Sequence, residues 1–227
     1  MGNRKWIAGI VTAVLMGMAA GCSSRPAVEE SVQTSAERTE APSAEEQIVK
    51  PTAPSPDIHY LAESLTDGGD MFQSMVEHGD GKLTNYVREI TDAAFEEIQL
   101  LNPDVLIISG DLSLQGEKRS HEELAGRLDA LERAGIAVVV IPGNHDINNP
   151  SAAVYSGMDR YPAEPTTPAD FVSIYSEFGY SEANSRDIHS LSYTYDLGPS
   201  MRLLMLDTCQ YEPRNRVGGM IKTETYE

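Results

Sequence analysis

The sequence is poor in cysteine and in basic residues, and both shortages narrow what the protein can be. Only Cys22 and Cys209 occur among 227 residues, so a framework of disulfides is excluded. The chain has 17 Lys and Arg against 35 Asp and Glu, for a formal net charge of −18. An acidic surface of this kind is a poor partner for nucleic acid, so we expect no nucleic-acid binding by a basic surface.

The longest apolar run, residues 6–20, is short for a helix that crosses a membrane. Arg4 and Lys5 precede it, and small residues lead from it to Cys22. A basic start, a short apolar run and small residues before a cysteine resemble a bacterial lipoprotein signal. We therefore predict a signal peptide over residues 1–22, lipid attachment at Cys22, and an exported protein anchored on the extracytoplasmic face of the cell membrane. An uncleaved anchor, or a secretory signal cut elsewhere, is the alternative.

Large apolar residues are also scarce in residues 23–56, where Ser, Glu, Thr, Ala and Pro dominate. Such a composition cannot bury enough surface to offset the entropy lost on ordering. We predict a disordered acidic tether there, followed by a folded domain over residues 57–227. Three prolines within residues 51–56 exclude a central strand directly before Asp57.

Two continuous apolar runs, residues 105–109 and 136–141, are typical of strands buried on both faces. A helical pattern lies between them, with Ser120 and Glu123 at the spacing of a capping box and Gly135 placed to close the helix. The strand-helix-strand order predicts parallel pairing through a right-handed crossover. The fold class is therefore α/β.

The rest of the domain gives weaker signals. Apolar residues recur at helical spacing over residues 83–101, and residues 171–178 have the pattern of a short amphipathic helix. Residues 191–206 alternate, turn at a Gly-Pro-Ser and run back, which predicts an antiparallel hairpin. No completed element is predicted from Val217 onward, and no internal repeat is present.

Side chains that bind metals follow both predicted strands. The first strand ends at Gly110-Asp111, and the second is followed by Gly143-Asn144-His145-Asp146. Parallel neighbouring strands end at one edge of a sheet, which is where ligands bind in open α/β folds. Asp57 and His59, two residues apart, would share one face of an extended segment. Alone, this pair is more simply explained by chance; ahead of the other two motifs it becomes informative.

Taken in this order, the three motifs resemble those of the calcineurin-like metallophosphoesterases, over roughly residues 57–207. That family shows Asp-x-His, then Gly-Asp, then Gly-Asn-His-Asp or Glu, each after a strand. The resemblance implies a sandwich of two mixed β-sheets flanked by helices. It also implies metal-dependent hydrolysis of phosphoric mono- or diesters, with a small phosphoester or a lipid head group as substrate.

The resemblance further implies a site with two divalent metal ions, of which Mn, Fe or Zn would suit the oxygen and nitrogen ligands. Asp57 and His59 would bind the first metal. Asp111 would bridge both metals, and Asn144 would bind the second through its amide oxygen. Two such ions about 3.5–4 Å apart share a water and lower its pKa.

Two further residues receive catalytic roles from the resemblance. His145 would lie beside the phosphate and protonate the leaving oxygen, and Asp146 would orient its ring. A positioned general acid contributes roughly 10²–10⁴ in rate.

The later Gly-His and Gly-His-x-His motifs of the family do not occur in this sequence. We therefore expect a C-terminally truncated chain with an incomplete sandwich and weak metal binding. The alternative is a catalytically inactive surface lipoprotein that binds a partner or a cell-wall component; a solute-binding lipoprotein is a third, weaker option. The remaining histidines have simpler interpretations: a surface position for His78, a solvated helix position for His121 and a backbone hydrogen bond for His189.

Two residues near the end of the hairpin also have simpler interpretations. Asp207 is expected to support a turn or a neighbouring ligand. Cys209 is expected to be a small buried hydrophobic residue.

Overall fold

The computed structural model describes residues 57–79, 81–212 and 215–225, so the predicted signal peptide and tether at residues 1–56 lie outside the described residues. The α-helices are α1 (Asp70–Glu77), α2 (Val87–Leu101), α3 (Lys118–Arg133) and α4 (Pro168–Ile174). Short 3₁₀ turns cover Glu63–Leu65, Thr84–Tyr86 and Thr223–Thr225, and a π turn covers Ser176–Tyr180. The strands are β1 (Val105–Ser109), β2 (Ala137–Ile141), β3 (Ala153–Ser156), β4 (Asp159–Pro162), β5 (Ser185–Arg186), β6 (Tyr193–Leu197), β7 (Met201–Met205), β8 (Cys209–Gln210) and β9 (Arg216–Gly219).

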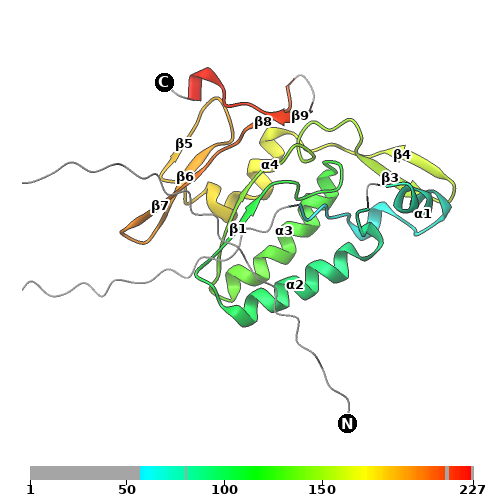
Figure 1. Cartoon of the computed structure of the whole chain (residues 1–227), viewed down its shortest axis with the longest axis horizontal. Helices are drawn as coiled ribbons and strands as arrows, with labels where there is room; N and C mark the ends of the chain where they lie inside the picture. Colours follow the sequence, from blue (N-terminus) through cyan, green and yellow to red (C-terminus); the bar gives the residue numbers. More distant parts are fainter. Residues whose placement is uncertain (1–56, 80, 213–214, 226–227) are drawn as a thin grey trace, which may run out of the picture. The chain divides into compact units, whose positions relative to one another are not determined.

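The strand-helix-strand unit that places the site is confirmed. β1 and β2 pair in parallel, from Val105 opposite Ala137 to Ser109 opposite Ile141, and α3 connects them (Figure 1). Leu124, which α3 buries with Leu128 and Leu131, packs into the same core as both strands. Because the two strands end in register, the loops that follow them start side by side.

The segment that precedes this unit lies beside the loop after β1. The backbone N–H of His59 donates to the Asp111 carbonyl at 2.9 Å, and that of Tyr60 donates to the Leu112 carbonyl at 2.9 Å. The segment is not extended through the Asp-x-His motif, as the predicted shared face requires, because Asp57 and His59 have φ of 59° and 50°. Each of these residues turns the chain sharply, so a shared face does not follow from their spacing.

The start of α3 and the buried face of α2 differ from what the sequence pattern predicts. α3 begins one residue after Glu117, so Ser120 lies inside the helix, where its Oγ accepts from the Ala62 backbone N–H, and the predicted capping box is wrong. α2 ends at Leu101, and the C-cap residue Asn102 has φ of 44°. Its buried residues include Thr91 and Phe95, while Ile90 is 48% exposed. The buried face of α2 therefore does not follow the apolar residues alone.

The antiparallel strands complete an α/β fold built of small sheets, as expected for an incomplete sandwich. The predicted hairpin is β6–β7, with β5 along its edge. Its Tyr193 hydroxyl donates to the Val140 carbonyl of β2 at 2.7 Å, which ties this sheet to the parallel pair. The β3–β4 hairpin was not predicted, and β9, which pairs with β8, corrects the expectation that no element forms after Val217.

Candidate metal centre

Three side chains with metal-binding atoms meet at the ends of the parallel strands. They are His59, Asp111 and His145, whose ligand atoms all lie within 4.8 Å of one another. The His59 Nε2 is 4.0 Å from the Asp111 Oδ2, and the two imidazole rings are 4.7 Å apart and nearly perpendicular. Each residue is half-buried and comes from a different segment of the chain. The tertiary fold therefore assembles a group that no single segment carries.

Two glycines allow the loops after β1 and β2 to approach this closely. A Cβ on Gly110, whose φ is 105°, would lie 2.7 Å from the Gly143 Cα. A Cβ on Gly143 would lie 2.1 Å from the Asp111 backbone nitrogen. Through this contact the Asp111 Oδ1 accepts from the His145 backbone N–H at 2.9 Å. The Gly-Asp and Gly-Asn-His-Asp motifs thus need glycine for space.

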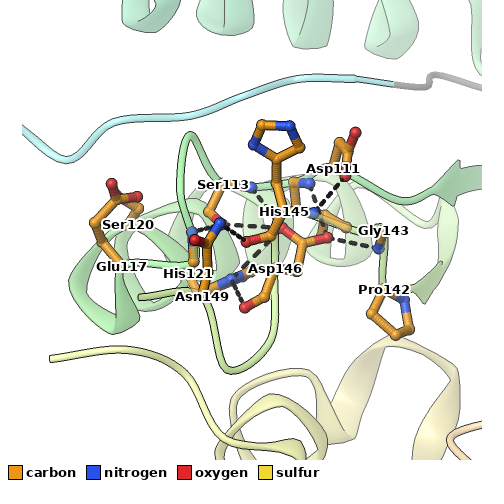
Figure 2. A network of polar contacts seen from close by, with 12 residues as sticks. Asp111, Ser113, Glu117, Ser120, His121, Pro142, Gly143, His145, Asp146 and Asn149 are labelled. Carbon is orange, nitrogen blue, oxygen red and sulfur yellow. Dashed lines mark hydrogen bonds and ion pairs between the residues drawn. The ribbon is translucent and has the colours of Figure 1, made fainter. Parts of the chain in front are cut away.

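The Asp146 carboxylate accepts hydrogen bonds from the loops after β1 and β2 (Figure 2). Its Oδ1 accepts from the Ser113 backbone N–H and hydroxyl, each at 2.9 Å, and its Oδ2 accepts from the backbone N–H of Gly143 at 2.7 Å and of Leu112 at 3.2 Å. The side chain is fully buried. All of these contacts are donors to the carboxylate, so both of its oxygens have hydrogen-bond partners inside the core.

The ring of His145 is oriented by a different group from the one we expected. Figure 2 shows the ring pointing away from the Asp146 carboxylate. Its Nδ1 lies 2.7 Å from the Leu114 carbonyl, which can only accept, so Nδ1 carries the proton. Nε2 is then the ring nitrogen that is available to a metal or to a proton. Asp146 acts on His145 through the loop backbone.

His121 is the functional-site neighbour that sequence reasoning missed. It is fully buried, not solvated, with Nδ1 2.9 Å from the Tyr175 hydroxyl and Nε2 3.2 Å from the Asp146 carbonyl. Burial lowers the pKa of His121, so it is neutral at pH 7. Its spacing from Leu124 and Leu128 places it on the inner face of α3, and this spacing was the available signal.

The other two predicted metal ligands are Asp57, which is not one of the three residues, and Asn144, which is next to His145 in the chain. Asp57 is exposed and shares with His59 the lining of a cleft of about 240 Å³. Asn144 precedes His145 in the same loop, is half-buried, and accepts at its backbone carbonyl from Asn215 at 3.0 Å. Their predicted roles stay predictions.

The residues present fit a divalent metal. Within the described residues, the buried His59 Nδ1 has no hydrogen-bond partner. Burial, and then the charges of Lys82 and His145, lower the pKa of His59, which favours the neutral ligand form. The His59 imidazole and the Asp111 carboxylate are donors that suit Mn, Fe or Zn, and the His145 imidazole lies beside them.

The remaining candidates have structural roles close to those expected. His78 is exposed at the end of α1 and its Nδ1 lies 2.8 Å from the Ser74 carbonyl, and His189 accepts at its backbone carbonyl from Lys222. Asp207 is buried and accepts from two backbone N–H groups and a tyrosine hydroxyl, which is the turn role expected. Cys209 is partly buried, and burial raises the pKa of its thiol to about 12. Within the ranges the structure describes, no helix is both long and apolar enough to span a bilayer.

Comparison with known proteins gives two findings. Residues 56–207 match the model of the calcineurin-like phosphoesterase family. Over 54 residues the chain is 41% identical to a probable cyclic nucleotide phosphodiesterase of Synechococcus sp.. That alignment covers 24% of this chain and 20% of the relative, so the chain matches about a fifth of the relative's length. The family match extends over more than half of the chain, and the chain belongs to the calcineurin-like phosphoesterase family.

Proposed function

We propose that this chain belongs to an enzyme that hydrolyses phosphoric esters with two divalent metal ions, Mn, Fe or Zn. The observation that carries the proposal is that the predicted metal ligands His59 and Asp111 converge with the predicted general acid His145, one side-chain N or O atom of each lying within 4.8 Å of the others. The Asp111 carboxylate has two oxygens in different settings: one accepts from the His145 N–H and the other faces His59. A carboxylate placed in this way supports the predicted bridging role.

The protein's own groups supply the rest of the chemistry. Divalent ions bound here would neutralise the phosphoryl oxygens and lower the pKa of a water. His145, with its Nδ1 held by the Leu114 carbonyl, presents Nε2 to the ester and can hold the proton that the leaving oxygen takes. Asp146 keeps both loops at a fixed separation through its four hydrogen bonds.

The test compares His145→Ala with Asp111→Asn, using bis-p-nitrophenyl phosphate and Mn²⁺. We expect His145→Ala to lower turnover by roughly 10²–10⁴ with less effect on metal content. Asp111→Asn should instead lose bound Mn²⁺, because an amide has one oxygen and no charge. Metal content of the purified protein is measured beside turnover. Mn²⁺ binding by Asp111→Asn that equals that of the parent would refute the proposed metal site and favour the inactive lipoprotein.

The substrate and the location complete the proposal. The relative's name makes phosphodiesters, cyclic nucleotides among them, the first small molecules to test, and a lipid head group is the other class.

We propose export, with lipid attached at Cys22 and the membrane as a partner through that anchor; the support is the sequence of residues 1–22. Cys22→Ala should release the protein from the membrane fraction. Equal fractionation of the variant and the parent would contradict the anchor.

A further inference from the structure

A cleft of about 350 Å³ opens beside His145. Its apolar lining side chains are Met75, Val76, Leu114 and Tyr155. Gln115 is one of its polar lining residues, and among the described residues neither His59 nor Asp111 lines it. The cleft therefore borders the predicted general acid and not the predicted metal ligands. A group that leaves with the proton of His145 would enter this cleft.

Gln115 belongs to a loop that packs against the loop carrying His145. At the next residue, Gly116, φ is 75°, and a Cβ would lie 2.8 Å from the His145 carbonyl oxygen and 3.0 Å from the Asn149 Cβ. The Gln115 backbone N–H donates to the Glu117 Oε2 at 3.0 Å. Close packing and this hydrogen bond together hold the backbone of Gln115 in a fixed position relative to His145.

A chain of hydrogen bonds fixes which end of the Gln115 amide is offered to the cleft. The Asn149 side chain is buried, and its Oδ1 accepts from the Ser151 backbone N–H at 2.9 Å. Its Nδ2 is therefore the end that donates to the His145 carbonyl at 2.9 Å. The same Nδ2 donates to the Gln115 Oε1 at 3.0 Å. The Gln115 Nε2 is left, and no group in the described part of the chain accepts from it, so the amide offers the cleft a donor.

We propose that Gln115 is a specificity-determining residue, whose Nε2 donates to an oxygen acceptor on the leaving alcohol of the phosphoric ester. This inference rests on the proposed function. The apolar side chains of the cleft cover the body of the alcohol, and Gln115 selects the alcohols that carry an acceptor. An alcohol without one is disfavoured, because the amide donor then loses its water and gains no partner. The substrate class is esters of alcohols with an apolar body and an oxygen acceptor.

The experiment measures equilibrium binding by calorimetry with Mn²⁺ present, using benzylphosphonate and its 2-, 3- and 4-acetyl derivatives. A CH₂ replaces the leaving oxygen in these probes, so they are not hydrolysed, and the isomers place one acceptor at different positions on the same ring. The parent should bind at least one isomer about fivefold more tightly than benzylphosphonate, as for one neutral hydrogen bond. Met75→Ala should weaken every probe about threefold by loss of apolar contact, and keep that preference.

Gln115→Glu is the decisive variant, because a carboxylate still accepts from the Asn149 Nδ2 but has no proton to donate into the cleft at about pH 8. The preference for the acetyl isomer over benzylphosphonate should disappear, whereas a purely structural role of Gln115 would leave that preference unchanged. Gln99→Glu is the matched control, because Gln99 is exposed on α2 and is not among the residues that line the cleft. Its preference should equal that of the parent.

Circular dichroism and urea unfolding of each variant check that the fold is kept. The inference is overturned if no acetyl isomer binds the parent more tightly than benzylphosphonate does, or if Gln115→Glu keeps the preference of Gln99→Glu. Mn²⁺-dependent turnover of bis-p-nitrophenyl phosphate by the parent, measured separately, decides the proposed function whichever way the binding falls.

Discussion

Replacing Gly143 by alanine is the sharpest test of the site, because the two loops touch there. The added Cβ would lie 2.1 Å from the Asp111 backbone nitrogen and 2.2 Å from its Oδ1. Non-bonded heavy atoms normally stay about 3.5 Å apart or more. The loops must therefore separate by about 1.4 Å, because the backbone nitrogen cannot rotate away as the end of a side chain can.

The size of the effect follows from that displacement. Overpacking of this kind costs about 1–3 kcal/mol of unfolding free energy. A misplacement of about 1 Å in a catalytic geometry costs about 10²-fold in rate. Displacing a group that holds a metal ligand in place lowers metal affinity by about 10–100-fold. The Asp111 carboxylate bears the shift directly, so Mn²⁺ affinity should fall by this amount.

Gly126→Ala provides the matched control. Gly126 lies inside α3, and a Cβ there would meet nothing within 4 Å. The same substitution should therefore raise the free energy of unfolding by about 0.5–1 kcal/mol and leave the site unchanged. Urea unfolding and Mn²⁺ calorimetry on the parent and both variants give all the required numbers. If Gly143→Ala keeps the Mn²⁺ affinity of Gly126→Ala, the close approach of the two loops does not exist in the folded protein.

Three further predictions concern the groups around the site. Asp146→Asn should lower the free energy of unfolding by roughly 2–5 kcal/mol, because an amide nitrogen would face backbone donors. An unchanged midpoint in urea unfolding would count against the hydrogen bonds to Asp146. Glu117 is buried and burial raises its pKa to about 7, so the folded chain keeps a proton that the unfolded chain releases above pH 4.5. The protonated Glu117 stabilises the folded chain fully below pH 4.5, and this contribution is lost as the pH rises to about 7. The unfolding free energy of Glu117→Gln should therefore rise by roughly 3 kcal/mol relative to that of the parent between pH 4.5 and pH 8. A constant difference between the two proteins in urea unfolding would contradict this. Asp57→Ala should weaken Mn²⁺ binding less than His59→Ala does in calorimetry, because Asp57 is exposed and outside the three-residue group; equal losses would restore Asp57 as a full ligand.

Sequence reasoning located the site because its signals are local. Two apolar runs that end on Gly-Asp and Gly-Asn-His-Asp fix two parallel strands and the edge where they meet, and the structure has both. The helix patterns were equally local, and α2 and α3 form where apolar spacing indicates.

Errors arose where a partner distant in the sequence decides the outcome. Ser120 and Glu123 have the spacing of a capping box, but the Ser120 hydroxyl accepts from the Ala62 backbone N–H of another segment, and the helix begins at Lys118. His121 has a polar side chain on a helix, yet Tyr175 and the Asp146 backbone satisfy both ring nitrogens inside the core. Polar residues are buried only when partners exist, and those partners are invisible in a local window.

The sequence by itself determined the fold class, the parallel strand pair and the family, because periodicity and motif spacing act over a few residues. Only the tertiary structure decided which side chains meet. It brought His59, Asp111 and His145 together and left Asp57 exposed. It also oriented the His145 ring through a hydrogen bond to the Leu114 carbonyl. The physical reason is that a ligand group depends on distances between separate segments, which packing and hydrogen bonding set only when the whole domain is folded.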